Sequence, residues 1–564
     1  MPSHDVLIIG AGLAGQRAAL AAAQSGASVA IMSKVHPVRS HSVAAAGGIN
    51  AAISVDDDWR SHAYDTVKGS DFLGDQDAIE VMCSEAPTEV MHLEHIGVTF
   101  HRNDEGELDL RAFGGASLKR TAYVADITGQ ALLHVLYEQL MKHHETVERY
   151  EEWFTTSLLL DDEGSCCGVI AREIRSGQME AFTAKNVILA CGGAGQAYKP
   201  TTNGLIVTGD GIALGYRVGA PLMDMEMVQY HPTTLVETGI LITEGARGEG
   251  AHLLNAQGER FMEKSAPNKM ELASRDVVSR AEQIEIDEGR GVGPDGAGIY
   301  LDVTVVPRRR TLEALREIVN LGRDFAGVDI TREPIMIRPG QHYIMGGVKT
   351  DIDGRTPIEG LYAAGEVACV SVHGGNRLGA NSLLDTLIFG RRAGEHAAAR
   401  AARMGMPSPD GKAQLREDSE RIAQIIARPR DGRRVSEIKN ELGEMMNRYA
   451  AVFRDEDGLQ TALETVGRLR EEADRAWIDD RGTVFNQDVL GAMELGFMID
   501  CAEATVVAAI ERKESRDAQF RTDYPERDDE HWLKHIDITL ADGKPEISYS
   551  PVTITQWQPE ERKY

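Results

Sequence analysis

The chain has 564 residues, of which 42% are apolar, and this is enough to bury the cores of about three or four domains. Aspartate and glutamate number 88 against 60 lysines and arginines, so the formal net charge is −28. This acidic balance argues against a nucleic acid as partner, because binding to its phosphate backbone needs clustered positive charge. It still allows a small anionic substrate, because a few local arginines can outweigh a distant net charge.

The six cysteines lack the spacing of a metal or iron–sulfur site, and the adjacent pair Cys166 and Cys167 is no exception. We therefore expect a reduced chain without a metal or an iron–sulfur cluster of its own. No apolar run reaches the roughly 18 residues of a membrane-spanning helix. The N-terminus also lacks the basic region of a secretory signal. Any membrane association is expected to come through a partner.

The N-terminal segment predicts a dinucleotide-binding βαβ unit. A buried strand is expected over Asp5–Gly10, the turn Gly10-Ala-Gly12-Leu-Ala-Gly15 follows, and a helix over residues 16–24 leads to a second strand over 28–32. Glycines in such a turn let a pyrophosphate approach the N-terminus of the helix. The second strand ends in Ser33-Lys34, without the acidic residue that usually binds the ribose of a nicotinamide cofactor. FAD, or a variant site, is therefore favoured over free NAD.

Two later segments resemble further parts of a flavoprotein domain. Residues 186–190 predict a strand that runs into the glycine-rich segment 192–195, and residues 360–366 predict another strand that ends in Gly365-Glu366. In such folds the final acidic residue typically meets hydroxyls of the flavin chain. Together with the N-terminal unit, these segments favour one FAD domain assembled from distant pieces of the chain.

The remaining segments have other sequence patterns. Residues from about 227 to 341 have their own turns and helices, as expected of an inserted lid. After Pro407 two helical stripes appear, which we interpret as packing surfaces and not as a cofactor site. The stripes consist of Ile438, Leu442, Met445, Met446 and Tyr449, and of Leu459, Leu463 and Val466. The tail from about 521 is expected to form an irregular cap with a β-hairpin.

These observations predict an α/β fold: a Rossmann-like FAD-binding domain with an inserted α+β capping domain, followed by a helical domain and a small C-terminal cap. The expected division is 1–226 and 342–407 for the two parts of the FAD-binding domain, 227–341 for the cap, 408–520 for the helical domain and 521–564 for the C-terminal domain.

Cations and hydrogen-bond donors recur in the predicted loops. A single arginine there is compatible with a surface ion pair that contributes little. Because guanidinium groups bind carboxylates bidentately, the set as a whole predicts a site for a dianionic substrate. The segments are Arg39-Ser-His41, His231-Pro-Thr, Thr243-Glu244-Gly-Ala-Arg247, Ser274-Arg275-Asp276, Gln341-His342-Tyr and Asn376-Arg377.

These segments are part of a longer ordered set of motifs, which resembles the flavoprotein subunit of succinate dehydrogenase and fumarate reductase. The resemblance extends from residue 5 to the end of the chain. The motifs include GAGLAG, RSHSVAAAGGI, DTVKGSDFLGDQDA, FGGASLKRT, TGDG, HPTT, TEGARGEG, SRDVVSR, QHYIMGG, AAGEVACVSVHGGNRLGANSLL and FGRRAGEHA.

The resemblance implies an enzyme that oxidises succinate by hydride transfer to FAD bound covalently through His41. It implies that Arg275 exchanges a proton with the substrate, with Glu244 and Arg247 as the relay behind it. The residues implied to hold the two carboxylates are His231, Thr243, His342 and Arg377. Those implied to bind the cofactor are Gly10, Ala11, Gly12, Ala14, Gly15, Ser33, Lys34, Ser40, His41, Gly47, Gly48, Asp210, Glu366, Asn381, Ser382 and Leu383.

The resemblance also implies partners and a location. Electrons are expected to pass to an iron–sulfur subunit and then to a membrane anchor with quinone, which would hold this chain peripherally at the cytoplasmic face of the inner (plasma) membrane. The direction of turnover stays open, because Ala46 stands where succinate dehydrogenases commonly carry Gln and fumarate reductases carry Glu.

Two other functions share parts of this pattern. L-aspartate oxidase shares the glycine-rich loop, but its members lack the covalent histidine, so His41 weighs against it. A non-catalytic subunit that keeps FAD would not need His231, His342, Arg275 and Arg377 together.

Overall fold

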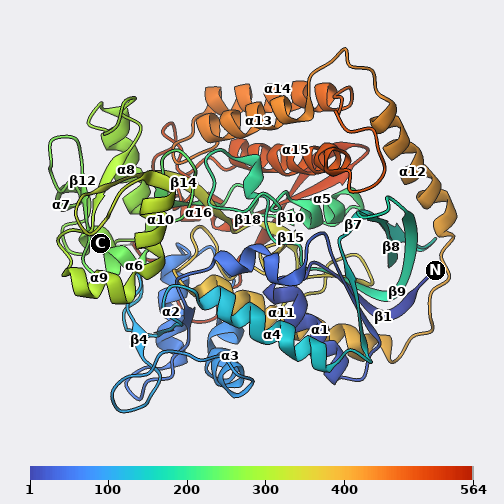
Figure 1. Ribbon diagram of the computed structural model, residues 1–564, viewed down its shortest axis with the longest axis horizontal. Helices are drawn as coiled ribbons and strands as arrows, with labels where there is room; N and C mark the ends of the chain where they lie inside the picture. The colour runs from blue at the N-terminus through green and yellow to red at the C-terminus, as the bar shows by residue number, and fades with distance from the viewer. Residues whose placement is uncertain (562–564) are drawn as a thin grey trace.

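The N-terminal βαβ unit begins a large mixed sheet in the computed structural model, which describes residues 1–561 (Figure 1). Strand β1 (Ser3–Ile9) runs parallel to β2 (Val29–Ser33), and helix α1 (Leu13–Gln24) connects them. On its other side β1 pairs in parallel with β9 (Met179–Leu189), so a distant segment lies beside the first strand. The remaining strands are β6 (Val147–Glu151), β7 (Trp153–Leu160), β8 (Cys166–Glu173) and β16 (Leu361–Ala363).

Both faces of this sheet are buried, and the alternation of side chains along β1 divides the core into two parts. Val6 and Ile8 pack with α1 and with α11 (Asn381–Ala401), whereas Leu7 and Ile9 face the core that contains α13 and α15. Helices α3 (Gln76–His95) and α4 (Thr128–Lys142) cover the first face together with α1 and α11.

Helices α1 and α11 approach each other closely because glycines lie between them. A Cβ atom at Gly390 would lie 2.7 Å from the carbonyl oxygen of Ala14, and one at Gly394 would lie 2.3 Å from that of Ala18. Neither position has room for a larger residue without a shift of the helices.

A second sheet lies beside the first and is surrounded by short helices, on the left of Figure 1. Its strand order is β11 (Val228–Leu235), β14 (Ile335–Ile344), β13 (Ile299–Asp302) and β12 (His252–Leu254). This region has its own apolar core. The helices are α6 (Gly245–Gly248), α7 (Met262–Ser265), α8 (Arg275–Asp287), α9 (Arg308–Ala314) and α10 (Arg316–Ala326).

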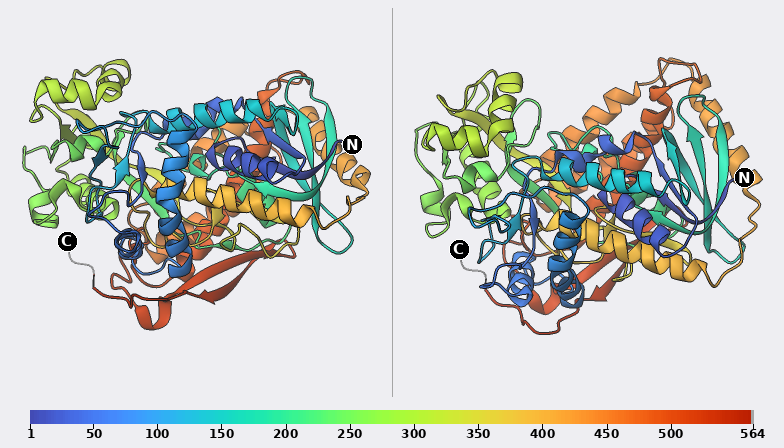
Figure 2. Two further views of the ribbon diagram at one scale, coloured as in Figure 1. Left: turned by 90° about the horizontal axis from the view of Figure 1, so that it is seen from below. Right: turned by 60° about the horizontal axis from the view of Figure 1, so that its bottom comes forward.

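The C-terminal third adds helices along the top and right edge of Figure 1 and a hairpin that is seen at the bottom of the left view of Figure 2. The helices are α12 (Gly411–Ala427), α13 (Val435–Tyr449), α14 (Glu456–Ala473) and α15 (Gln487–Glu511). The hairpin of β18 (Lys534–Ala541) and β19 (Lys544–Pro551) joins β10 (Leu222–Met223), which also pairs with β15 (Gly347–Lys349). Strand β17 (Ala368–Cys369) completes this sheet beside β15.

The remaining elements are β3 (Ile49–Asn50), β4 (Leu110–Arg111), β5 (Thr121–Ala122), α2 (Trp59–Gly69), α5 (Asp210–Arg217) and α16 (Asp529–Trp532). The domain division stays a prediction: its boundary after 226 precedes β11, and that after 341 falls inside β14. Among residues 1–561, no helix has the length and apolar character needed to cross a bilayer.

Candidate functional site

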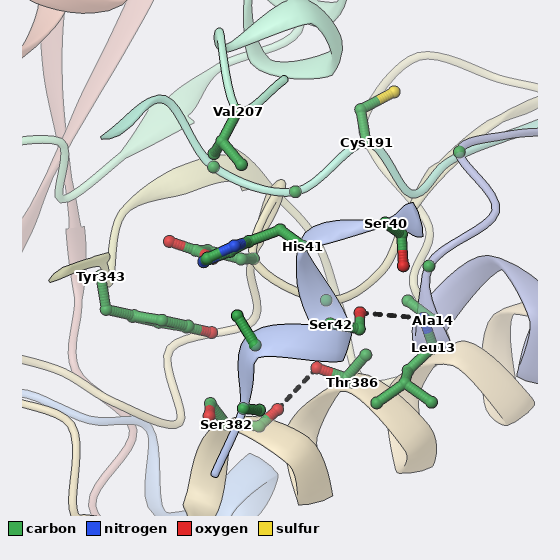
Figure 3. A pocket seen from close by; sticks show the side chains of 18 of the residues that line it. Leu13, Ala14, Ser40, His41, Ser42, Cys191, Val207, Tyr343, Ser382 and Thr386 are labelled. Atoms are coloured by element: carbon green, nitrogen blue, oxygen red, sulfur yellow. Dashed lines mark hydrogen bonds between the residues drawn. The ribbon is translucent and has the colours of Figure 1, made fainter. Parts of the chain in front are cut away.

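A continuous cavity extends from the glycine turn after β1 to the β11–β14 pair, and segments from the whole first two-thirds of the chain line it (Figure 3). All but three of the predicted site residues contribute to its wall. The three exceptions are Gly15, Asn381 and Arg247, which lie directly behind it.

At one end of the cavity the backbone of the turn needs glycine. Gly10 has φ +109°, and a Cβ there would lie 2.1 Å from the carbonyl oxygen of Ala190. A Cβ at Gly15 would lie 1.9 Å from the carbonyl oxygen of Gly10, so this residue sets the close packing of helix and turn. The turn thus brings the N-terminus of α1 to the cavity wall, the arrangement that binds phosphates in dinucleotide sites.

Polar groups beside this turn fit a dinucleotide. The Ser40 hydroxyl is buried at the cavity wall and finds no hydrogen-bond partner among residues 1–561. Glu366 is fully desolvated, which raises the pKa of its carboxyl to about 7, and it accepts a hydrogen bond from the Ile344 amide at 3.1 Å. The ammonium group of Lys34 donates hydrogen bonds to the side chains of Thr208, Asp210 and Glu494 at 2.7–2.8 Å.

His41 points into the cavity from the loop after β2 (Figure 3). Its Nδ1 accepts a hydrogen bond from the Gly204 amide at 3.3 Å. Burial lowers the pKa of the imidazole to about 4, so the ring is neutral at physiological pH. A neutral imidazole keeps a nucleophilic lone pair, in contrast to the solvated histidine that a loop usually carries.

At the other end the β11–β14 ladder presents two histidines side by side. The rings of His231 and His342 lie 4.9 Å apart, edge to face. Burial, assisted by Arg275, lowers the pKa of both rings well below the usual value. His231 Nδ1 accepts from the Thr233 amide at 3.2 Å, so its Nε2 carries the proton, and His342 Nδ1 shares a 2.8 Å hydrogen bond with the Thr202 hydroxyl. His231 can therefore donate from Nε2 to an anion, and His342 can do the same from its Nε2 when Nδ1 accepts from the Thr202 hydroxyl.

Two buried arginines flank one carboxylate in this wall. Arg275, the first residue of α8, donates from Nε to Glu244 Oε2 at 2.9 Å and from Nη1 to Gln229 Oε1 at 2.9 Å. Arg247 lies behind, with Nη2 3.6 Å from the same Glu244 oxygen. Burial would raise the pKa of Glu244, but Arg275 and Arg247 outweigh it and lower the pKa to about 2. The three residues therefore form a contiguous charged chain that ends at the cavity.

Arg377 reaches the cavity from the loop before α11. It is 4% exposed, and its Nε has no hydrogen-bond partner among the described residues. Its backbone is held by Gln229, whose Nε2 donates to the Arg377 carbonyl at 2.8 Å. Burial and the neighbouring Arg275 lower the pKa of the guanidinium to about 9. A cation without a protein counter-charge is suited to an anionic ligand.

Several residues that line or support this end of the cavity are not among the predicted site residues. Gln229 connects the side chain of Arg275 with the Arg377 loop, and Tyr343 lies beneath the Arg377 guanidinium. The motifs HPTT and QHYIMGG contained Thr233 and Tyr343, but no spacing rule distinguishes them from ordinary strand residues. Asn381, which was predicted to contact the cofactor, bonds instead within the protein to Asn50, His62 and Thr66.

Comparisons with known proteins agree with this arrangement. A family model described as an FAD binding domain matches residues 5–383, and one described as the C-terminal part of fumarate reductase flavoprotein matches residues 439–564. The succinate dehydrogenase flavoprotein subunit of Rickettsia conorii is 44% identical over 98% of this chain and 95% of the relative. The fumarate reductase flavoprotein subunit of Mycobacterium tuberculosis is 45% identical over 100% and 99%.

Solved structures give the same result. A quinol fumarate reductase of E. coli superposes with a TM-score of 0.96 at 39% identity, covering 100% of this chain and 99% of that one. The succinate dehydrogenase 1 complex of Mycobacterium smegmatis superposes with a TM-score of 0.86 at 35% identity, covering 99% and 95%. The fold class predicted from the sequence is thereby confirmed. The chain belongs to the family of flavoprotein subunits of succinate dehydrogenase and fumarate reductase.

Proposed function

We propose that this chain is the catalytic flavoprotein subunit of a succinate:quinone oxidoreductase, which interconverts succinate and fumarate. The observation that supports this most is the composition of the cavity. It joins a dinucleotide turn at one end to two arginines and two neutral histidines at the other. A linear C4 dicarboxylate needs such a distribution of donors, with one group of them for each carboxylate.

The residues at the far end would bind and orient the substrate. The planar guanidinium of Arg377 can hold one carboxylate with two parallel hydrogen bonds, while His231, His342 and Thr243 offer single donors for the remaining oxygens. FAD, held between the glycine turn and Glu366, would supply the two-electron acceptor or donor for the hydride. Fixing both carboxylates aligns the two carbon–hydrogen bonds that change, which is a proximity effect worth several orders of magnitude in rate.

Arg275 would exchange the proton. In the direction of fumarate reduction its guanidinium donates a proton to the substrate carbon, and in succinate oxidation it takes the proton up. Glu244 contacts Arg275 at 2.9 Å and is ionised throughout the working pH range, so it can pass a proton between the two arginines. A free guanidinium has a pKa above about 12, which makes it a good acid and a poor base. Glu244, which lies between Arg275 and Arg247, would carry the proton to and from Arg275.

We further propose that FAD is attached covalently through the imidazole of His41. Support comes from the motif RSHSV, from the position of the side chain in the cavity, and from the neutral state of the ring. Nδ1 accepts from the Gly204 amide, so Nε2 would form the bond. The imidazole N–H proton and one proton of the flavin methyl group would leave, and the two electrons would pass to the flavin ring.

Electrons would leave through partner subunits. Within residues 1–561 no group of three or more potential metal ligands gathers in one place. We propose an iron–sulfur subunit and, through it, a membrane anchor with quinone, which would hold the chain peripherally at the cytoplasmic face of the inner membrane. Purification of the complex from membranes, followed by identification of its subunits, tests this proposal.

Dye-linked turnover tests the function. The flavin-loaded chain should reduce an artificial electron acceptor when succinate is added and should oxidise a reduced dye when fumarate is added, and malonate should inhibit both reactions. The ratio of the two rates sets the direction, which Ala46 leaves open. Turnover with L-aspartate and none with succinate would instead assign the chain to the aspartate oxidases.

A further inference from the structure

The positive charge of Arg377 has an unusual environment. Among the described residues no carboxylate lies within ion-pair distance of its guanidinium, and its Nε makes no hydrogen bond. The group that lies against it is the aromatic ring of Tyr343, whose centroid is 4.7 Å from the guanidinium carbon. The face of an aromatic ring attracts a cation, and the attraction is strongest where water is excluded.

Tyr343 is itself held from behind by two residues of other elements. Its hydroxyl donates to Asp385 Oδ2 at 3.2 Å, and Asp385 belongs to α11. His373, in the loop after β17, has its Nε2 3.3 Å from the same oxygen, and its ring meets that of Tyr343 edge to face at 5.4 Å. All three side chains are at most 6% exposed. The orientation of the Tyr343 ring is therefore set by contacts outside the cavity.

The hydrogen bond to Asp385 also changes the ring. A phenol that donates to a carboxylate becomes richer in electrons, and a richer ring attracts a cation more strongly. Burial and the nearby Asp385 raise the pKa of Tyr343 well above its usual value, so the hydroxyl stays protonated and remains a donor. Asp385 and His373 thus act on Arg377 only through Tyr343.

Tyr343 also borders the cavity. Tyr343 lines the same space as His41, His342 and Arg377, and Figure 3 shows its ring extending into that space. The Arg377 backbone is held separately by Gln229. The main chain and the side chain of Arg377 therefore have two independent supports.

We propose that Tyr343 is a positioning residue for Arg377. Its ring, fixed by Asp385 and His373, keeps the guanidinium directed at the dicarboxylate site and stabilises its charge where no described carboxylate forms an ion pair with it. This inference rests on the proposed function, in which Arg377 binds a carboxylate of the substrate. It predicts that affinity for dicarboxylates depends on an aromatic ring at position 343 and, less strongly, on the carboxylate at 385.

The test is a series of variants of the full-length, flavin-loaded protein, with malonate as the probe in isothermal titration calorimetry. Tyr343→Phe keeps the ring and should weaken malonate binding by only about threefold. Tyr343→Leu removes the ring and should weaken it by about 30-fold, the size of a buried cation–π contact. Asp385→Asn should fall between the two. In steady-state assays the Tyr343→Leu variant should lose kcat/KM mainly through KM.

A buried tyrosine outside the cavity provides the matched control. Tyr362 is 1% exposed, its hydroxyl lies 2.9 Å from His396 Nδ1, and it does not line the cavity. Tyr362→Leu should bind malonate as the unmodified protein does, even if its melting temperature falls. Equal losses of affinity in the two leucine variants would overturn the proposal, because they would reflect general destabilisation.

Two further outcomes would also decide against it. If Tyr343→Leu loses FAD but its flavin-loaded fraction binds malonate normally, then Tyr343 is a cofactor contact and not a support for Arg377. If Tyr343→Leu does not fold, the two milder variants decide. Malonate affinities of Tyr343→Phe and Asp385→Asn equal to that of the unmodified protein would then overturn the role of the polarised ring. Failure of the unmodified protein to bind malonate would instead reject the proposed function itself.

Discussion

Replacing Arg275 with lysine removes two hydrogen bonds at once while keeping the positive charge. The guanidinium spans Glu244 and Gln229, at 2.9 Å from Nε and 2.9 Å from Nη1, and an ammonium group is a point charge that cannot span both. If Arg275 exchanges the substrate proton, the variant should lose most of that contribution. Proton transfer by a positioned side chain contributes about 10² to 10⁴ in rate. We therefore expect kcat to fall by about 10³, or about 4 kcal/mol of transition-state stabilisation, in both directions.

Binding should behave differently from turnover. The change leaves the other residues that donate hydrogen bonds to the substrate carboxylates in place, namely His231, His342 and Arg377. The affinity for malonate should therefore stay within about threefold of that of the unmodified protein, and the flavin content should be unchanged. The assay compares kcat, malonate affinity and bound flavin in one preparation. Arg280→Lys, on the same helix but paired with Asp276 outside the cavity, is the control and should leave all three unchanged.

A role as a mere carboxylate clamp would give the reverse pattern. In that case Arg275→Lys would raise KM and spare kcat, because an interaction made equally in the ground and transition states would have been lost. A kcat within about tenfold of the unmodified protein, a loss of only about 1.4 kcal/mol, would refute the role in proton exchange.

Four further changes have defined outcomes. His41→Ser should fold and bind FAD without a covalent bond, so that acid releases all flavin from the variant while the unmodified protein keeps it on a peptide containing His41. It should also lose succinate oxidation more than fumarate reduction. Arg377→Lys should weaken malonate binding by at least about tenfold, because it loses the bidentate fork. Glu244→Gln should resemble a milder Arg275→Lys, with kcat reduced and binding spared. Glu282→Gln should become more stable than the unmodified protein as the pH rises: burial raises the carboxyl pKa well above its usual value, so the folded state retains a proton that the unfolded chain releases above about pH 4.3. Melting temperatures at pH 5 and pH 8 measure this. Glu285→Gln should instead be less stable than the unmodified protein by about the same amount at both pH values, because Arg290 lowers the pKa of Glu285 and its carboxyl is ionised in the folded and unfolded states at both.

The elements that glycine and apolar residues delimit could be predicted closely. The strand expected over 5–10 is β1 at Ser3–Ile9, and the strand expected over 28–32 is β2 at Val29–Ser33. The stripes after Pro407 became α13 and α14, whose apolar faces are buried as expected. Such segments carry their own period and their own stop signals, so local rules suffice.

Helix α15 at Gln487–Glu511 falls inside the helical domain expected over 408–520, but its bounds were not predicted, because it is apolar on nearly all sides. A helix buried all round has no hydrophobic period to detect. The expected helix over 16–24 begins earlier, at Leu13, since Gly12 is its N-cap and the last glycine of the motif lies inside the first turn.

The site divides in the same way. Residues within compact motifs, such as His41 and Arg275, could be proposed from the sequence because a family resemblance is recognised from runs of consecutive residues. The residues that hold the site residues in place could not be predicted. Gln229 accepts a hydrogen bond from Arg275 across the fold, and Asp385 accepts one from Tyr343 on the side of α11. Contacts of this kind depend on how β11, β14, α8 and α11 pack, and no local pattern records that.

The proposed reaction of this cavity is the exchange of a hydride and a proton with a C4 dicarboxylate. The most direct measurement is an anaerobic titration of the flavin-loaded chain, followed by its absorbance near the flavin maximum. Succinate should bleach the flavin, fumarate should restore the oxidised spectrum, and malonate should prevent both changes. A flavin that succinate and fumarate leave unaltered while L-aspartate bleaches it would contradict the account.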